Sequence, residues 1–162
     1  MMRAIQLAVA CVAVLVATAG RSEAGIITFE AYAQTGSGED YYASPFDVDG
    51  YRFTGNLVAN DYAIVQTGSV DFSGSTALLP FTNETHTFRR IDGAAFSLNS
   101  FDYSEQDILF IGASTVTFTG NFVGGGTIIQ AVTSDGVIGS QNAVFTGFSN
   151  LSSVVFEYTI AL

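Results

Sequence analysis

The chain has 162 residues, enough for one domain with a sizeable core, and its formal net charge is −10. Only 12% of the residues are charged, whereas 48% are hydrophobic and 13% aromatic, and this composition excludes a disordered chain. The negative charge also argues against nucleic acid and anionic membrane surfaces as partners, because an acidic protein with few cations cannot neutralise phosphates.

The first 24 residues have the pattern of a secretory signal peptide. Arg3 supplies the positive start, residues 5–17 are apolar apart from one glutamine, and Ser22-Glu23-Ala24 offers small residues where a signal peptidase reads. This apolar stretch is shorter than the ~20 residues of a membrane span. We therefore expect a signal peptide over 1–24, a secreted or cell-surface mature chain, and no stable membrane span after cleavage.

The remainder, residues 25–162, is expected to form a single domain without disulfides. The only cysteine, Cys11, lies within the expected signal peptide. The hydrophobic core must then supply the stability alone, and a domain of about this size can bury roughly two-thirds of its unfolded surface.

The alternation of apolar and polar residues predicts short strands in this domain. Along Thr115–Val123, apolar side chains alternate with threonines, which is typical of a strand with one solvent face. The glycines at 124–126 predict a hairpin to a second strand, Thr127–Thr133. The same alternation recurs over Ser153–Ile160. Further predicted strands are Ile26–Glu30, Tyr51–Gly55, Tyr62–Gln66, Thr76–Leu79, Thr85–Ile91, Ala94–Leu98 and Ile108–Ile111.

Many short strands at regular spacing predict an all-β fold, which we expect to be an antiparallel β-sandwich of jelly-roll-like type. Dipeptides such as Asp49-Gly50 and Asp92-Gly93 favour turns between the strands. Residues 36–49 are expected to form a longer polar loop. The residues expected to point inward are Phe53, Phe88, Phe96, Val116, Phe118, Phe145, Val154 and Phe156.

Four segments after the signal peptide resemble a known family. They are Ile27-Thr28-Phe29-Glu30, the stretch 88–102 (FRRIDGAAFSLNSFD), the stretch 115–120 (TVTFTG) and the stretch 145–151 (FTGFSNL). In this order they resemble the secreted bacterial proteins that carry a PEP-CTERM sorting tail. The resemblance implies a β-sandwich body and a role in the exopolysaccharide matrix outside the cell.

The sorting tail of that family is not found in this sequence. The tail consists of a Pro-Glu-Pro motif, a transmembrane helix and a basic end, whereas the only prolines here are Pro45 and Pro80. Two alternatives stay open: a chain truncated before the tail, and a tail-less relative.

The residues that could support catalysis form no recognisable motif. His86 is the only histidine, it has no ligand spacing, and we expect it to lie on the surface at the start of a strand. Two carboxylates about 5–10 Å apart could hydrolyse glycosides. A secreted carbohydrate-active enzyme of the glycoside hydrolase type is therefore the alternative to a non-enzymatic protein, with no catalytic residue assigned.

Calcium is the metal that the acidic residues would suit best, because Ca²⁺ takes carboxylate and carbonyl oxygens from loops. No cofactor is required by the sequence. By analogy with jelly-roll carbohydrate modules, in which a structural calcium joins the first and last strands, Glu30 and Glu157 are the candidate metal ligands.

Four tyrosines near the polar loop could form a platform for sugar rings: Tyr41, Tyr42, Tyr51 and Tyr62. The two adjacent arginines Arg89 and Arg90 should point to opposite faces of a strand, and one of them should pair with an acid such as Asp92 or Asp102. We therefore expect a secreted, non-enzymatic extracellular matrix or cell-surface protein, with extracellular polysaccharide as the candidate partner.

Overall fold

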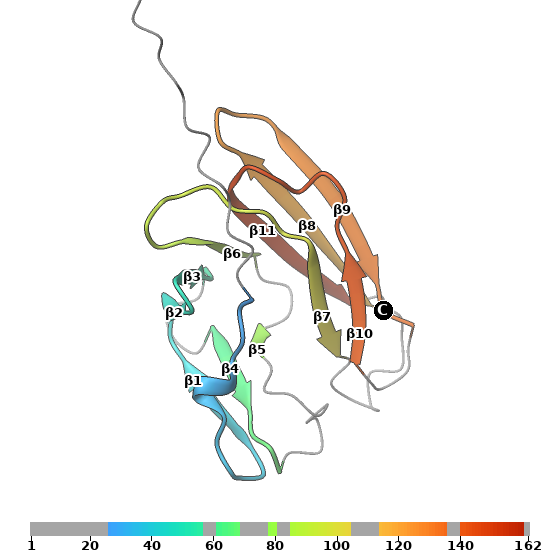
Figure 1. Ribbon diagram of the computed structural model, residues 1–162. Helices are drawn as coiled ribbons and strands as arrows, with labels where there is room; N and C mark the ends of the chain where they lie inside the picture. The colour runs from blue at the N-terminus through green and yellow to red at the C-terminus, as the bar shows by residue number, and fades with distance from the viewer. Residues whose placement is uncertain are drawn as a thin grey trace, which may run out of the picture.

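The computed structural model describes residues 26–56, 61–68, 78–80, 85–104, 114–135 and 140–160. Within these ranges the chain forms strands and one short 3-10 helix, and every strand pair is antiparallel, so the expected all-β, sandwich-like antiparallel fold is confirmed (Figure 1). The elements are η1 (Glu30–Tyr32), β1 (Glu39–Tyr42), β2 (Phe46–Val48), β3 (Tyr51–Thr54), β4 (Tyr62–Val65), β5 (Leu78–Pro80), β6 (Thr85–Arg90), β7 (Ser100–Ser104), β8 (Ser114–Phe122), β9 (Thr127–Thr133), β10 (Ser140–Val144) and β11 (Leu151–Ile160).

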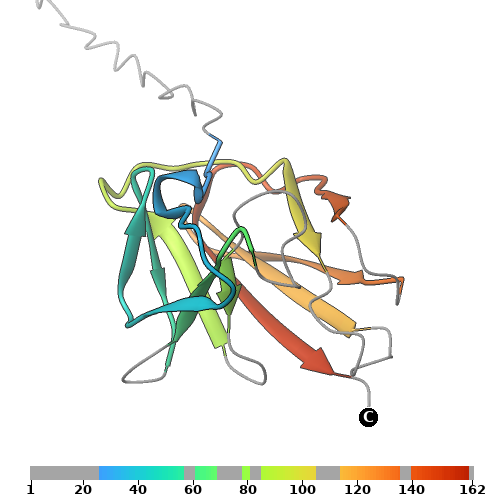
Figure 2. The ribbon, with the colours of Figure 1, turned by 90° about the horizontal axis from the view of Figure 1, so that it is seen from below.

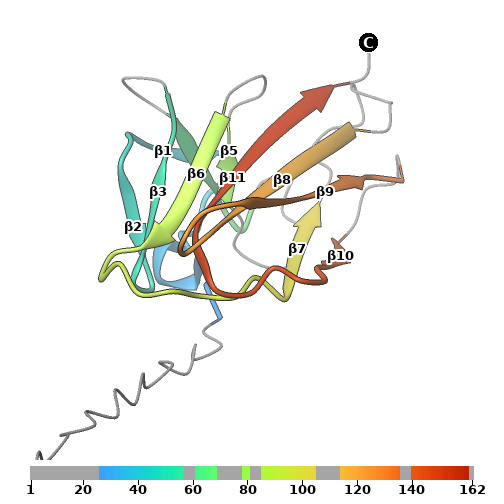
Figure 3. The same cartoon turned by 90° about the horizontal axis from the view of Figure 1, so that it is seen from above.

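The largest layer is a six-stranded sheet in the order β2-β3-β6-β11-β8-β9 (Figure 3). A three-stranded sheet, β1-β4-β5, and the pair β10-β7 lie against one of its faces (Figure 2). Ring contacts join the layers: Tyr62 of β4 lies 6.3 Å from Phe53 of β3, and Phe101 of β7 lies 5.4 Å from Phe118 of β8, between ring centroids. Among the described residues, no further layer of strands packs on the other face of the large sheet, which therefore faces solvent.

The core between the layers contains the residues that the sequence predicts. Seven of the eight expected side chains are buried and belong to one cluster, and Val116 is partly buried against it. Because each strand of the large sheet alternates its side chains, the aromatic positions all meet on the inner face. Burial of this aromatic surface is the main stabilising contribution to the fold.

The hairpin over residues 114–133 forms as predicted. β8 pairs with β9 from Thr115 opposite Thr133 to Asn121 opposite Thr127. The glycines at 124, 125 and 126 all have positive φ, between 87° and 102°, which a residue without Cβ adopts at no steric cost. At the other end of the sheet, Asp49 and Gly50 have φ of 48° and 79° and form the tight turn between β2 and β3.

The prediction of a longer polar loop over residues 36–49 is wrong, because this segment contains two strands. β1 pairs with β4, and β2 pairs with β3 at the edge of the large sheet. In β2, Phe46 and Val48 are buried on either side of exposed Asp47. This short alternation is obscured in the sequence by the acids and the proline around it.

Several other strand predictions differ from the structure. Residues 26–29 form no strand, and Glu30 begins η1. The expected strand Ala94–Leu98 is reduced to a single bridge between Phe96 and Leu151. β5 overlaps only the end of Thr76–Leu79, and Ile108–Ile111 lies outside the described residues. β7 and β10 were not predicted; they pair with each other.

Where the structure describes the chain, no helix combines the length and the apolar character needed to cross a bilayer.

Candidate functional site

The solvent-facing side of the six-stranded sheet is the surface that the structure builds most regularly, and we call it the outer face. Its side chains come from positions that alternate with the buried aromatic residues, so the packing of the core fixes their direction. It is composed mostly of hydroxyl-bearing and small residues: Thr54, Thr85, Thr87, Thr115, Thr117, Thr119, Asn121, Thr127, Ile129, Ala131, Thr133, Ser153 and Val155. Its charged members are Asp47, Arg52, Arg89 and Glu157.

Strand register aligns these side chains in rows across the sheet. One row runs Thr54, Thr87, Val155, Thr119 and Ile129, each opposite the next on the neighbouring strand. Neighbouring strands lie about 4.8 Å apart, and residues two apart in one strand are about 6.7 Å apart. The outer face is therefore a regularly spaced array of short side chains.

A second row, parallel to the first, runs Thr85, Glu157, Thr117 and Ala131. The hydroxyl of Thr85 donates to the Glu157 carboxylate at 3.3 Å, so this acid is engaged by a neighbour on the same face. Glu157 is the only acid within the hydroxyl-rich part of the face among the described residues.

Side-chain hydrogen bonds between strands hold the margins of the hydroxyl-rich area. The hydroxyls of Thr115 and Thr133 lie 3.1 Å apart, and the Asn121 amide donates to the Ser153 hydroxyl at 3.0 Å. In the described part of the chain, no such bond engages the hydroxyls of Thr87 and Thr119 at the centre. These central hydroxyls are therefore available to a ligand.

The charged groups gather at the β2–β3 end of the outer face. Arg52 donates two hydrogen bonds to Asp47, at 2.8 and 2.7 Å, and Arg89 lies opposite Arg52 on β6. The hydrogen bond from Arg52 lowers the pKa of the Asp47 carboxyl. The arrangement neutralises Asp47 and leaves Arg89 as an exposed cation beside the threonines.

Arg90 points to the other face of β6, as the alternation predicts. It forms a salt bridge of 2.6 Å with Asp92, one of the two acids that the sequence named. The same hydrogen bond, together with one from the Ala94 N–H, lowers the pKa of Asp92 to about 2. This pair closes the turn after β6 and has no part in the outer face.

Two of the four tyrosines expected to bind sugar are part of the core, which corrects the predicted platform. Tyr62 is fully buried, and Tyr51 packs edge-on against Phe96 with ring centroids 5.5 Å apart. Burial raises the pKa of Tyr62 far above its usual value. A ring enclosed on both sides cannot stack on a sugar from solvent, because stacking requires one open ring face.

The other two tyrosines lie on β1, in the second layer rather than on the outer face. Tyr42 is partly buried and packs against Phe46, with ring centroids 5.0 Å apart. Tyr41 is 53% exposed, and its hydroxyl donates to Glu39 at 2.8 Å, which raises the pKa of the Tyr41 phenol. Tyr41 is thus the single member of the predicted set with an exposed ring.

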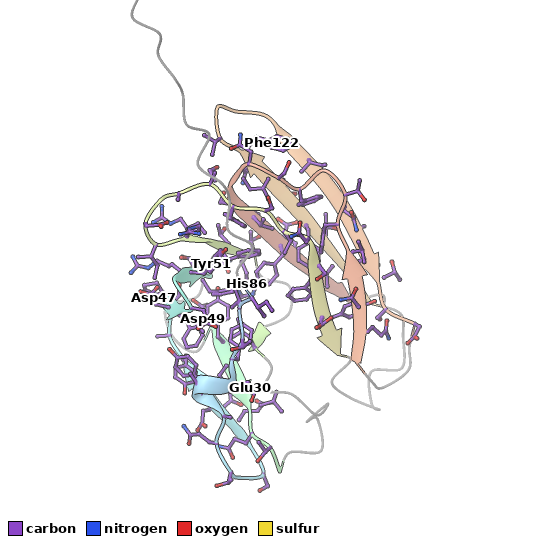
Figure 4. The ribbon with its side chains drawn as sticks, in the orientation of Figure 1. Glu30, Asp47, Asp49, Tyr51, His86 and Phe122 are labelled. Atoms are coloured by element: carbon purple, nitrogen blue, oxygen red, sulfur yellow. The ribbon has the colours of Figure 1, made fainter. Side chains whose placement is uncertain are left out.

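The prediction that His86 lies on the surface is also wrong, because its side chain is fully buried (Figure 4). Its ring lies between Tyr62 and Phe156, with centroid distances of 5.1 and 5.3 Å. His86 is two residues from Phe88, so the alternation of β6 already placed both on one face. The residue serves as a core aromatic group.

The candidate calcium ligands lie on opposite sides of the large sheet. Glu157 belongs to the outer face, whereas Glu30 begins η1, whose Tyr32 packs on Phe46 of the inner face, 4.9 Å between centroids (Figure 4). Calcium binds its oxygens at about 2.3–2.6 Å, so these two carboxylates cannot share one ion. Within the described ranges, no group of three or more metal-binding side chains comes together.

The outer face itself was not named as a site from the sequence. The signal for it was present in the threonines that alternate with Val116 and Phe118, but which strands would place their threonines beside these depends on long-range pairing. Searches with the chain against protein-family models, curated proteins and solved structures gave no match.

Proposed function

We propose that the protein is a secreted, non-enzymatic matrix or cell-surface protein whose outer face contacts an uncharged extracellular polysaccharide. The observation that carries the proposal is the regular array of short hydroxyl side chains over the centre of the outer face. Hydroxyl groups can donate and accept, so they match sugar hydroxyls in either direction.

The composition of the face suits a flat neutral polymer. Threonine and Val155 supply methyl groups against which the C–H face of a sugar ring can lie, and the threonine hydroxyls supply hydrogen bonds beside it. Short β-branched side chains also lose little conformational freedom on binding. An extended polysaccharide chain could thus cross several strands without disturbing the fold.

Charge decides which polysaccharide class is favoured. The whole chain has a net charge of −10, and this negative field repels anionic polymers. On the face itself, Asp47 is paired with Arg52, and Arg89 adds a cation. A neutral polysaccharide avoids the repulsion and still meets hydrogen-bonding groups, including the Arg89 guanidinium at the margin.

The test is binding to a panel of insoluble and soluble neutral polysaccharides, measured by co-sedimentation and by affinity electrophoresis. Thr119→Glu places a charge at the centre of the array, and we expect it to weaken binding by about tenfold or more, since a carboxylate must then be desolvated against the sugar. The matched control is Thr146→Glu, the same change at an exposed threonine between β10 and β11.

Two results would overturn the proposal. Binding that is equal in both variants would remove the outer face from the interaction. Release of reducing ends from the same polysaccharides, lost on replacing one carboxylate by its amide, would establish the glycoside hydrolase alternative.

A further inference from the structure

The two edges of the six-stranded sheet differ sharply, and the difference points to a second surface. The β2 edge has three residues and is bound by the N-terminal segment: the Tyr32 hydroxyl donates to the Asp47 carbonyl at 2.8 Å, and the Thr28 N–H donates to the Asp49 carboxylate at 2.8 Å. Short length, charge and covering segments are the usual protections of a sheet edge.

The β9 edge has none of these protections in the described part of the chain. β9 is seven residues long, contains no charged residue and no proline, and ends the sheet, with β8 as its one backbone partner among the described strands (Figure 1). Ile129 on this strand is 65% exposed. A long, uncharged edge strand with free backbone groups is a template for pairing with another strand.

The sequence of β9 is nearly symmetric about its central residue, Gln130. Exposed and partly buried positions alternate from one end to the other, beginning and ending with an exposed threonine. If two copies of β9 pair antiparallel about Gln130, Thr127 meets Thr133, Ile129 meets Ala131, and Ile128 meets Val132 of the second copy. Threonine thus faces threonine and apolar residues face apolar residues, and each contact occurs twice about the twofold axis, as in an isologous interface.

We propose that two copies of this chain associate through their β9 edges, in antiparallel register about Gln130, to form one continuous sheet. The pairing satisfies edge backbone groups in both copies and covers Ile129. Because the opposite edge is already protected at β2, the assembly stops at two copies. The inference is independent of the proposed function, although the dimer would place two outer faces side by side on one sheet.

No acidic residue of β9 lies in this contact, so the repulsion between two acidic copies acts only at longer range, where dissolved salt screens it. Asp135, the acid nearest to β9 in the sequence, would face the glycine turn at residue 125 of the second copy in this register, and it already accepts a hydrogen bond from Gln141 at 2.6 Å. The Gln130 side chain is directed toward β10, where its amide donates to the Val144 carbonyl at 2.8 Å, so it leaves the edge open at the twofold axis.

The experiment is sedimentation equilibrium of the purified protein over a wide concentration range. We expect a monomer–dimer equilibrium with no larger species. The double variant Ile129→Glu, Ala131→Glu places two like-charge pairs across the interface and should weaken dimerisation by about tenfold or more.

A charge-complementary variant tests the register. In Ile129→Glu, Ala131→Lys, the acid introduced at position 129 faces the lysine introduced at position 131 of the second copy, and dimerisation should be retained. Val155→Glu serves as the matched control, because it places two acids, with Glu157, at the same spacing on the same face of the central strand β11. This control should also remain dimeric, and circular dichroism should show that each variant is folded.

Three results would overturn the proposal: a monomer at every concentration, a dimer unaffected by the double acidic variant, or loss of the dimer in the charge-complementary variant. Growth of fibrils or of an open series of oligomers would contradict the closed twofold arrangement.

Discussion

Phe118 occupies the point where three parts of the structure meet. Its ring contacts Phe101 of β7, Phe145 before the final strand and Phe156 of β11, with centroid distances of 5.4, 5.0 and 6.0 Å. Aromatic pairs at such distances contribute about 0.5–1.5 kcal/mol beyond the burial of their area. The position therefore couples the two layers through a single side chain.

Phe118→Ala should lower the free energy of unfolding by about 3–5 kcal/mol, because it removes a buried ring and leaves a cavity. This is a large share of the about 5–15 kcal/mol that holds a typical domain folded. Urea denaturation gives the value. Val144→Ala, at a site that is 67% exposed, is the control and should stay within about 0.5 kcal/mol of the unmodified protein. Equal losses in the two variants would contradict the assigned packing.

Asp92 has a pKa lowered to about 2 in the folded protein, mainly by its hydrogen bond from Arg90. A lowered pKa means that the charged form stabilises the fold above the unfolded-state pKa of about 3.9. This stabilisation disappears as the pH falls through the folded-state value of about 2.

The melting temperature of Asp92→Asn should therefore lie below that of the unmodified protein at neutral pH. The two melting temperatures should converge as the pH falls from about 4 toward about 2. Thermal unfolding followed by circular dichroism at a series of pH values measures this convergence. A difference in melting temperature between the two proteins that stays constant over that range would show that the charge of Asp92 has no part in stability.

At the scale of an element, β8 depends on a glycine in its interior. A Cβ at Gly120 would lie 2.9 Å from Leu151 Cδ2 and 3.0 Å from both Ile128 Cγ2 and Phe148 Cδ1. Leu151 and Phe148 are buried, so these atoms have little room to move. The absence of a side chain lets the segment that enters β11 cross closely over β8.

Gly120→Ala should accordingly destabilise the protein by about 1–3 kcal/mol through overpacking. The sign of the change is decisive, because the same substitution at an unconstrained position would stabilise by about 0.4–1 kcal/mol. Thr117→Ala, on the outer face of the same strand, controls for changes in strand propensity and should cost less than about 1 kcal/mol. Urea unfolding of both variants would settle the comparison.

At the scale of the whole molecule, charge is strongly unbalanced. A net charge of −10 on 162 residues creates self-repulsion in the folded state, and the two salt bridges found among the described residues neutralise only Asp47 and Asp92. Among the other described acids, Glu157 lies on the outer face and Glu39 and Asp40 lie on β1 in the second layer. Repulsion between acids on opposite sides of the large sheet acts over distances at which dissolved salt screens it.

Added sodium chloride should therefore raise the melting temperature, with most of the rise complete by about 0.15 M, where the screening length is about 8 Å. Scanning calorimetry measures it. Calcium and magnesium chloride at equal ionic strength should give matching curves, in the unmodified protein and in Glu30→Gln alike. A calcium-specific rise that Glu30→Gln abolishes would contradict the placement of Glu30 and Glu157 on opposite sides of the sheet.

Local pattern determined much of this protein. The alternation over β8 and β11 predicted those strands and their inward residues, because side-chain direction in a strand follows from period two alone. The hairpin at residues 124–126 and the turn at Asp49-Gly50 were likewise predicted, since positive φ is a local property of glycine and its neighbours.

The tertiary structure decided what local pattern leaves open, namely which strands become neighbours and which side of each strand is covered. His86, Tyr51 and Tyr62 are buried because the strands that carry them pair with or face strands distant in the sequence. β1, β7 and β10 are short, and they form only because strands distant in the sequence supply their hydrogen bonds. The outer face exists for the same reason: threonines of separate strands become one surface only through the register that unites β3, β6, β11, β8 and β9.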